Sequence, residues 1–254
     1  VLIKAANKPL QSPKAVTENI GTDFRVNING ADDNGDEITE YKVYIMDNFN
    51  SAVHETMCTG LVITMRCTIS VARLRTVFGL SALSVGVNIA VKVSAINAFG
   101  EGELSLVSTN YGIMQDIPGN PLHTGSRDVL LTTKTLLRVN LPTLSDFSIA
   151  ETGATSLLYY NVQMKDNTNA FVDVIPRVNL HENAFFTIEN YTSGKTYEFR
   201  YFLGNVFGWS ANASPSFSVL AAVVPDEVLN LTLSRVNNMV NFSWDVIVDN
   251  GSAV

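Results

Sequence analysis

The chain has 254 residues, enough for two domains of about 100 residues each, and a formal net charge of −7 at pH 7. This acidic balance argues against a nucleic-acid-binding protein, whose phosphate contacts require clustered lysine and arginine. No apolar run reaches the ~18 residues that span a bilayer, the longest clean one being Val219 to Val224. A surface rich in Asn, Ser and Thr with few charges indicates an extracellular or cell-surface protein. Since the chain lacks an initiator Met and a basic-then-apolar leader, we expect a mature product or an excerpt of a longer protein.

At the start of the chain, residues Val1 to Ala6 predict a short apolar strand, and a proline-bearing connection, Lys8 to Pro13, follows it. Phe217 to Val224 is a similar apolar strand that leads into Pro225. We therefore interpret residues 1–12 as the last strand of a preceding sandwich.

Residues 13–114 predict a first complete domain. Apolar and polar residues alternate at Phe24 to Asn29 and at Thr39 to Ile45, which is the period of a half-buried strand. Less regular strands are predicted near Ser51 to Cys58 and Arg66 to Val71, and Leu80 and Leu83 precede a turn glycine. A strand from Val87 to Ala95 follows, and Leu104 and Leu106 begin the closing strand.

Residues 115–224 predict a second domain after the Gly/Pro-rich linker Tyr111 to Pro121. Its strands are centred on Val139, Val162, Phe171 to Ile175, Phe185 to Ile188 and Tyr197 to Leu203. The connection Pro142 to Ser156 is longer than its counterpart in the first domain. No helical periodicity is apparent in either domain.

Residues 225–254 predict the first two strands of a following sandwich. Leu229, Leu231 and Leu233 face one way on the first strand, and Val240, Phe242 and Trp244 do so on the second. An isolated hairpin cannot bury such a face by itself. The missing strands come either from a continuation of the chain or from a neighbouring copy by β-augmentation, and both imply a linear array.

An internal repeat connects the two domains. Placing Gly86 on Gly194 aligns Asn97 with Asn205, and Phe99 and Gly100 with Phe207 and Gly208, at one constant offset with no gap between them. Seven short strands in about 100 residues, separated by turn signals, predict an all-β fold of tandem seven-stranded Ig-like β-sandwiches.

The chain resembles the fibronectin type III family over nearly its whole length. In the first domain, the resemblance rests on the strand Ile38 to Tyr44 after an acidic-glycine turn, on Leu83 to Gly86, and on Asn97, Gly100 and Gly102. In the predicted third sandwich, the resemblance rests on Trp244, which ends a strand just before DNGSAV. The second domain carries it at five positions, namely Tyr191, Gly194, Tyr197, Asn205 and Gly208. The resemblance implies that Tyr197 is the corner tyrosine of this fold.

The chain also departs from the family. Ile89 stands at the corner-tyrosine position of the first domain, and Phe24 or Val26, and Val139 or Leu141, stand where the strand tryptophan would be. The turn from Ala98 to Glu101 lacks the Arg-Gly-Asp tripeptide, so the resemblance does not imply integrin binding.

Candidate chemistry is sparse, and we predict no catalytic, cofactor or metal site. His54, His123 and His181 have no carboxylate or cysteine at ligand spacing, and no nucleophile elbow or phosphate-binding loop occurs. Four acidic residues lie close together in one turn: Asp32, Asp33, Asp36 and Glu37. Because the third copy of this turn keeps only one of these carboxylates, a turn is favoured over a calcium site.

Two sets of residues suggest covalent modification. Cys58 and Cys67 flank a connection between two strands, and they form either a local disulfide or two free core thiols. Asn-x-Ser/Thr sequons occur at Asn190, Asn212, Asn230, Asn241 and Asn250. Of these, Asn212 is the weakest candidate for glycosylation, because Ser214 and Pro215 follow it.

These patterns favour a non-enzymatic structural segment of an extracellular repeat protein, which builds a stalk, fibre or filament by end-to-end packing of sandwiches. The partners would be other copies or neighbouring domains, with glycans as a further class. The alternative is an adhesion or receptor ectodomain that binds a protein or glycan through loops carrying Phe207 and Trp209. A spacer attached to an enzyme is a third reading.

Overall fold

A computed structural model describes residues 5–46, 52–58, 60–77, 84–165, 168–177 and 183–252. The chain forms two compact units. Unit 1 contains Val1–Gly119, Ser148–Ser156 and Asn205–Gly208, and unit 2 contains Asn120–Phe147, Leu157–Gly204 and Trp209–Val254. Two short segments of the second repeat thus belong to the first unit, and the domain limits predicted above remain a proposal.

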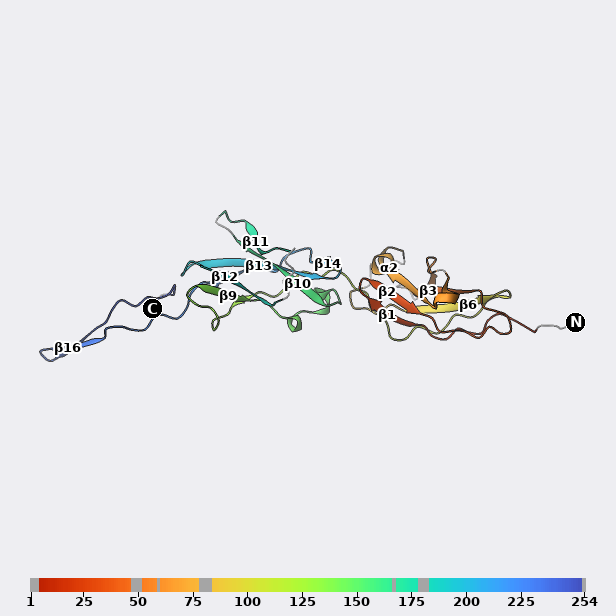
Figure 1. The fold of residues 1–254 in the computed structure, drawn as a ribbon, viewed down its shortest axis with the longest axis horizontal. Coiled ribbons are helices and arrows are strands. Elements are labelled where there is room, and N and C mark those ends of the chain that lie inside the picture. Colours follow the sequence, from red (N-terminus) through yellow and green to blue (C-terminus); the bar gives the residue numbers. More distant parts are fainter. Residues whose placement is uncertain are drawn as a thin grey trace. The chain divides into compact units, whose positions relative to one another are not determined.

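Unit 1 has two antiparallel sheets over its described residues (Figure 1). One has the strand order β1-β2-β5, with β1 at Val16–Ile20, β2 at Asp23–Asn27 and β5 at Arg66–Ser70. The other has the order β4-β3-β6-β7, with β4 at Ala52–His54, β3 at Glu40–Met46, β6 at Val91–Asn97 and β7 at Gly100–Glu101. Three short helices accompany them: α1 (Leu61–Thr64), α2 (Val71–Val77) and α3 (Ile149–Thr152).

Unit 2 repeats this strand order. One sheet runs β12-β9-β8, with β8 at Ser126–Arg127, β9 at Leu136–Asn140 and β12 at Phe185–Glu189. The other runs β11-β10-β13-β14, with β10 at Leu157–Lys165, β11 at Phe171–Ile175, β13 at Thr196–Asn205 and β14 at Gly208–Trp209. β15 (Phe217–Leu220) also pairs with β13, and the 3-10 helix η2 (Leu144–Asp146) lies in the long connection before β10. β14 and β15 both pair with β13, and between them Ser210 and Ser214 donate to the Leu203 and Tyr201 carbonyls of the same strand, so the two together form one closing edge. The predicted seven-stranded β-sandwich fold is confirmed.

Each unit has its own core, formed by the alternating residues that the sequence predicts. Phe24 and Val26 of β2 and Val43 of β3 are fully buried in unit 1. In unit 2, Val139 of β9 and Phe199 of β13 are fully buried. Period-2 alternation thus assigns one face of each strand to a core.

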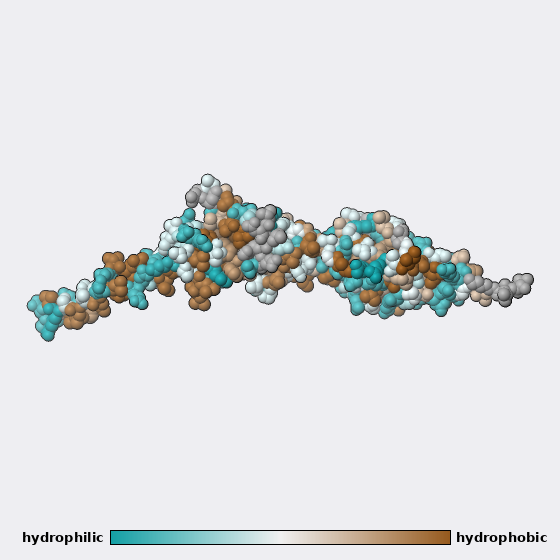
Figure 2. Space-filling view, in the orientation of Figure 1, coloured by the Kyte–Doolittle hydropathy of each residue, from teal (hydrophilic) through white to brown (hydrophobic). Residues whose placement is uncertain are grey.

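The last described strands form a hairpin of β16 (Thr232–Val236) and β17 (Met239–Ser243). Its apolar residues are exposed: Leu231 63%, Leu233 66%, Val240 53%, Phe242 60% and Trp244 54%. Figure 2 shows hydrophobic surface along this hairpin. A face of this size without a partner in the described chain is unusual for a soluble protein.

The Tyr197 hydroxyl accepts a hydrogen bond from the backbone N–H of Thr192 at 2.9 Å, which is the local geometry expected of a corner tyrosine. One expectation is wrong. The strand predicted from Val87 begins at Val91 as β6, because Ile89 N–H donates to the Gly112 carbonyl at 2.9 Å rather than to a strand of its sheet. Short helical segments also occur, although no helical period is apparent in the sequence. The predictions for residues 1–4, Leu80, Leu83 and His181 lie outside the described residues.

Candidate functional site

The clearest repeated feature is the junction at which a linker meets the turn of the sandwich that follows it. In the first junction, Asn7 N–H donates to the Asn34 carbonyl and Leu10 N–H donates to the Asp32 carbonyl, both at 3.1 Å. Gly35 has a φ of +87°, and a Cβ there would lie 2.6 Å from the Ala5 carbonyl oxygen. Only glycine lets the turn approach the linker this closely.

The second junction lies within unit 1 and has the same pattern. Asp116 N–H donates to the Gly153 carbonyl at 3.0 Å, and Gly119 N–H donates to the Ala150 carbonyl at 3.1 Å. The acceptors belong to α3 and its C-cap. Ser148 and Glu151 begin this helix with a capping box, in which each side chain accepts the other residue's backbone N–H.

The third junction lies in unit 2. Val223 N–H donates to the Asn250 carbonyl at 3.2 Å, and Asp226 N–H donates to the Val248 carbonyl at 3.1 Å. These donors and acceptors follow those of the first junction at twice the repeat offset. The linker and the turn are therefore held in the same register at both ends of the described chain.

In the first two junctions an asparagine at the end of a strand bonds to the linker and the turn together. The Asn97 amide donates to the Asn7 carbonyl at 2.7 Å and to the Asp33 carbonyl at 3.1 Å. The Asn205 amide donates to the Asp116 carbonyl at 2.7 Å and to the Thr152 carbonyl at 3.1 Å. Both side chains are buried, so loss of either amide would leave carbonyl groups without a partner.

The linkers also bond to the repeat that precedes them. Gly86 N–H donates to the Met114 carbonyl at 2.8 Å, and its aligned residue Gly194 donates to the Ala221 carbonyl at 2.9 Å. In unit 1, Arg75 donates to the Gln115 carbonyl at 2.6 Å and pairs with the Asp116 carboxylate at 3.0 Å. The second and third linkers thus form backbone hydrogen bonds both with the repeat that precedes them and with the turn that follows them.

The acidic turn is part of the first junction. Asp32 accepts the N–H of Asn34 at 2.8 Å, Asp33 accepts that of Gly35 at 2.9 Å, and Asp36 accepts that of Ala98 at 3.2 Å. Its carboxylates thus cap backbone groups of the turns. The described residues contain no group of three or more His, Cys, Asp or Glu placed to hold a metal ion.

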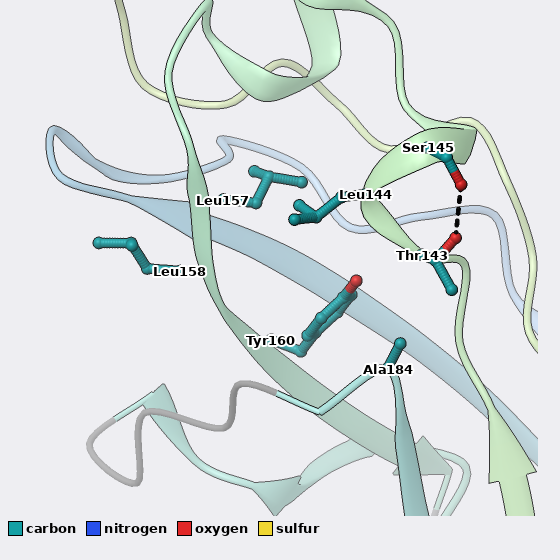
Figure 3. Close-up of a pocket in the computed structure, with 7 residues that line it drawn as sticks. All are labelled: Thr143, Leu144, Ser145, Leu157, Leu158, Tyr160 and Ala184. Carbon is teal, nitrogen blue, oxygen red and sulfur yellow. Dashed lines mark hydrogen bonds between the residues drawn. The ribbon is translucent and has the colours of Figure 1, made fainter.

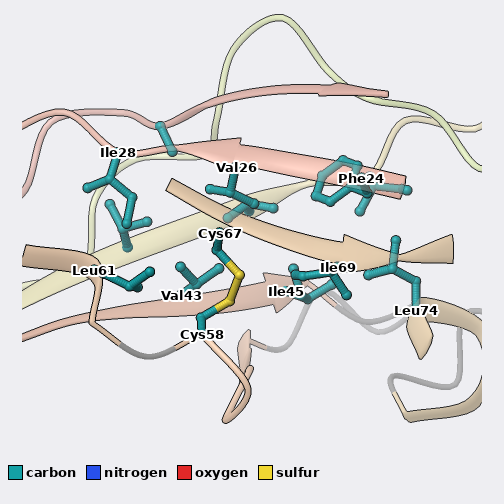
Figure 4. Close-up of a cluster of buried hydrophobic side chains, with 14 of the residues drawn as sticks. Phe24, Val26, Ile28, Val43, Ile45, Cys58, Leu61, Cys67, Ile69 and Leu74 are labelled. Carbon is teal, nitrogen blue, oxygen red and sulfur yellow. A yellow bond between two sulfur atoms is a disulfide. The ribbon is translucent and has the colours of Figure 1, made fainter. Parts of the chain in front are cut away.

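Cys58 and Cys67 form a disulfide in the core of unit 1, with their Cα atoms 5.5 Å apart (Figure 4). Cys67 belongs to β5, Cys58 follows β4, and these strands lie in different sheets. The bridge closes a loop that contains α1, whose Leu61 is buried beside it. Its presence in the protein as produced by its source remains a proposal.

The sequon asparagines differ in accessibility. Asn190, Asn230 and Asn241 are exposed, and the Asn230 amide donates to the Asp245 carboxylate at 2.6 Å. Asn250 is only 9% exposed, and its amide donates to the Val224 carbonyl at 2.7 Å and to Asp226 at 3.1 Å. A glycan on Asn250 would break the third junction, whereas one on the other three would not enter a core.

The two aromatic residues proposed as ligand anchors are half-buried. Phe207 packs against the core of unit 1. Trp209 lies on Gly204 in unit 2, where a Cβ would lie 3.1 Å from the indole ring. Neither ring projects freely from a loop tip, and ligand binding at these loops remains a prediction.

Unit 2 has an apolar pocket of about 460 Å³ next to η2 (Figure 3). It is lined by Thr143, Leu144, Ser145, Leu157, Leu158, Tyr160 and Ala184. The Tyr160 hydroxyl donates to the Pro142 carbonyl at 2.7 Å, and burial together with the charge of Asp146 raises the pKa of Tyr160 to about 12. A neutral phenol among aliphatic side chains has no means of acid–base chemistry near neutral pH.

Unit 1 has a polar network centred on Glu101 of β7. Its carboxylate accepts hydrogen bonds from the Tyr44 hydroxyl at 2.5 Å, the Ser94 hydroxyl at 2.6 Å and the Lys42 ammonium at 3.0 Å. Burial alone would raise the carboxyl pKa, but these three donors outweigh it and lower the pKa of Glu101 to about 2. The network joins β3, β6 and β7 across their outer face.

Sequence reasoning did not predict the linker contacts of Asn97, Asn205 and Arg75. The repeat placed both asparagines at matching positions, which was the available signal, but their linker acceptors lie far earlier in the chain. Sequence reasoning also missed α3, although the spacing Ser148-x-x-Glu151 is the capping-box pattern that indicates the start of a helix.

No protein-family model matches the chain, and no curated protein matches it. Among solved structures, the chain is similar to the chicken CNTN1 FN1–FN3 domains, with 13% sequence identity over 94% of this chain and 76% of that chain and a TM-score of 0.38. We base the fold assignment on strand order and register. None of the described helices is long and apolar enough to cross a membrane.

Proposed function

We propose that the chain is a non-enzymatic structural segment of an extracellular repeat protein, in which β-sandwiches follow one another in a stalk, fibre or filament. The recurrence of the linker hydrogen bonds of the first junction in the third carries this proposal. In an array of repeats, each repeat contacts mainly its neighbours, so the same linker bonds are expected at every junction. A domain that binds one ligand does not require the same bonds at successive linkers.

The C-terminal hairpin supports the same reading. Val16 pairs with Asn27 in unit 1, and Thr232 pairs with Ser243 in the hairpin, so β16–β17 has the register of β1–β2 shifted by twice the repeat offset. Phe24 and Val26 are fully buried, whereas their counterparts Val240 and Phe242 are 53% and 60% exposed. We infer that β16 and β17 are the first strands of a third sandwich, completed by strands equivalent to β3–β7.

An extracellular setting rests on the disulfide and on the three exposed sequons. Disulfides persist in oxidising compartments, and glycans attach to exposed asparagines in secreted proteins.

Electron microscopy of the protein isolated from its source tests the array. We expect domains at regular spacing in rods or filaments. Discrete particles, or strings in which the spacing between domains is irregular, would contradict the proposal.

A fusion tests the third sandwich. Since Gly35 corresponds to Gly251, joining residues 35–114 after Asn250 supplies the missing strands. We expect the amides of residues 228–246 to become protected from hydrogen exchange, and Trp244 to become less accessible to acrylamide. A fusion carrying the same residues in scrambled order is the control, and equal exchange in both fusions would refute the inference.

A further inference from the structure

The outer face of the sheet formed by β11, β10, β13 and β14 has a row of stacked cationic and aromatic side chains. Phe171 lies on β11, Arg200 and Phe202 lie on β13, and Trp209 lies on β14. Arg177, just after β11, completes the row. We refer to these five residues as the ladder.

Stacking orients the two guanidinium groups of the ladder. The Arg177 guanidinium carbon lies 4.7 Å from the centre of the Phe202 ring and 5.4 Å from that of Trp209. The Arg200 guanidinium carbon lies 4.1 Å from the centre of Phe171 and 5.9 Å from that of Phe202. A guanidinium held over a ring keeps its N–H donors available at its edge, where a carboxylate or sulfate binds in a bidentate manner.

The nearby carboxylates form hydrogen bonds or ion pairs with other residues. Glu198 pairs with Lys165 at 2.9 Å, and Asp173 accepts the amides of Asn161 and Gln163, each at 3.0 Å. The hydrogen bonds from these amides lower the pKa of Asp173, and the charge of Arg177 contributes to the same shift. Arg200 donates its Nε to Gln163 at 2.7 Å. Within the described residues neither ladder arginine forms an ion pair, although two positive charges face the same Phe202 ring.

The fold does not require this arrangement. At the repeat offset, Arg200, Phe202 and Trp209 correspond to Lys92, Ser94 and Glu101 of unit 1. Those positions belong to the same outer face, where Ser94 and Glu101 join the carboxylate-centred network. One repeat thus builds this face around a carboxylate and the other around two stacked arginines.

We propose that the ladder binds an anionic polysaccharide through its carboxylate or sulfate groups. Two guanidinium groups that face one ring place two cationic donors on the same patch, which suits a polymer with repeated anionic groups. The half-buried rings of Tyr159 and Trp209, whose centres lie 6.4 Å apart, provide adjacent apolar surface for the sugar rings.

Calorimetry with the full chain tests this proposal. The probe is a heparin-derived octasaccharide at low salt, compared with an uncharged dextran oligosaccharide of equal length and with hexaglutamate. We expect the octasaccharide alone to bind, and each of Arg177→Gln and Arg200→Gln to weaken binding about tenfold. Arg200→Lys retains the charge but not the planar fork, so an intermediate loss is expected.

Matched controls are Lys92→Gln, at the position of unit 1 that corresponds to Arg200, and Arg235→Gln on the exposed hairpin. Neither should alter binding, and circular dichroism establishes that every variant is folded. Octasaccharide binding that survives the Arg177→Gln/Arg200→Gln double variant would overturn the proposal. Absence of binding by the wild-type chain at millimolar octasaccharide would do so as well, and equally tight hexaglutamate binding would overturn the assignment to a polysaccharide.

Discussion

The Glu101 network offers a quantitative test of the fold of unit 1. Replacing Glu101 with Gln retains the shape of the side chain but removes the charge. It also replaces one of the two acceptor oxygens by an NH2 group, which is a donor next to the Tyr44, Ser94 and Lys42 donors. A carboxyl pKa lowered from 4.5 to about 2 corresponds to an upper bound of about 3.4 kcal/mol. Because 34% of the Glu101 side chain is exposed, solvent screening reduces the expected contribution to ~1.5 kcal/mol.

The pH dependence has a defined direction. A carboxyl whose pKa is lower in the folded state stabilises that state fully above its unfolded pKa, and this stabilisation is lost as the pH falls from about 4.5 towards 2. The difference in stability between wild type and Glu101→Gln should therefore be greatest near pH 7. It should decrease by more than half at pH 3.

Hydrogen exchange of peptides from β6 and β7, measured by mass spectrometry in urea, is the suitable assay. Both tryptophans, Trp209 and Trp244, lie outside the first repeat, so fluorescence does not report its unfolding. Glu103→Gln is the matched control, because Glu103 is exposed and close to Glu101 in the chain. A difference between wild type and Glu101→Gln that is equal at pH 7 and pH 3 would refute the electrostatic reasoning.

Three further changes probe the junctions and the core. Asn205→Ala removes two donated hydrogen bonds and should destabilise the second junction by about 2 kcal/mol, seen as faster amide exchange in residues 113–119 with exchange in β9 unchanged. Gly112→Ala places a Cβ 2.5 Å from the buried Phe24 ring, and this overpacking should lower the free energy of unfolding in urea by roughly 1–3 kcal/mol. In the control Gly21→Ala the Cβ meets no atom within 4 Å, so this variant measures the cost of a positive φ alone. Cys58→Ser/Cys67→Ser opens a loop with a sequence separation of 9 and should lower the unfolding free energy of unit 1 by about 2.5 kcal/mol. An equal decrease in unfolding free energy when reductant is added to the wild type would support this prediction.

Local patterns were sufficient to predict the sandwiches. In β2 and β13 every second residue is apolar, and this alternation predicts a strand without any knowledge of the tertiary structure. The turn from Ala98 to Glu101 was recognised from the internal repeat, since Asn97 and Gly100 recur at Asn205 and Gly208. By contrast, α1 and α3 have four residues each, which is too short to show a 3.6-residue period.

The candidate sites depend on distant residues, which is why most of them could not be predicted. Asn97 reaches a carbonyl 90 residues away, and the contact becomes visible only when the linker path is known. The ladder depends on the register of the whole sheet, since β12 and β13 separate Arg177 from Trp209 along the chain. Sequence reasoning proposed Trp209 as a loop anchor, whereas the structure places its ring on Gly204 of the neighbouring strand.

The connection from Pro142 to Ser156 differs in length from its counterpart in unit 1, yet Gly153 and Ala150 accept the linker N–H groups just as Asn34 and Asp32 do. The two acceptors of this connection, Ala150 and Gly153, are one residue further apart than Asp32 and Asn34, and the other additional residues precede Ala150, where η2 lies. The residues that bond to the linker are thus distinct from the residues by which the two connections differ in length. We therefore expect that foreign peptides, such as epitope tags or enzyme recognition sequences, can be inserted between Leu144 and Phe147 while the linker hydrogen bonds to Ala150 and Gly153 are retained.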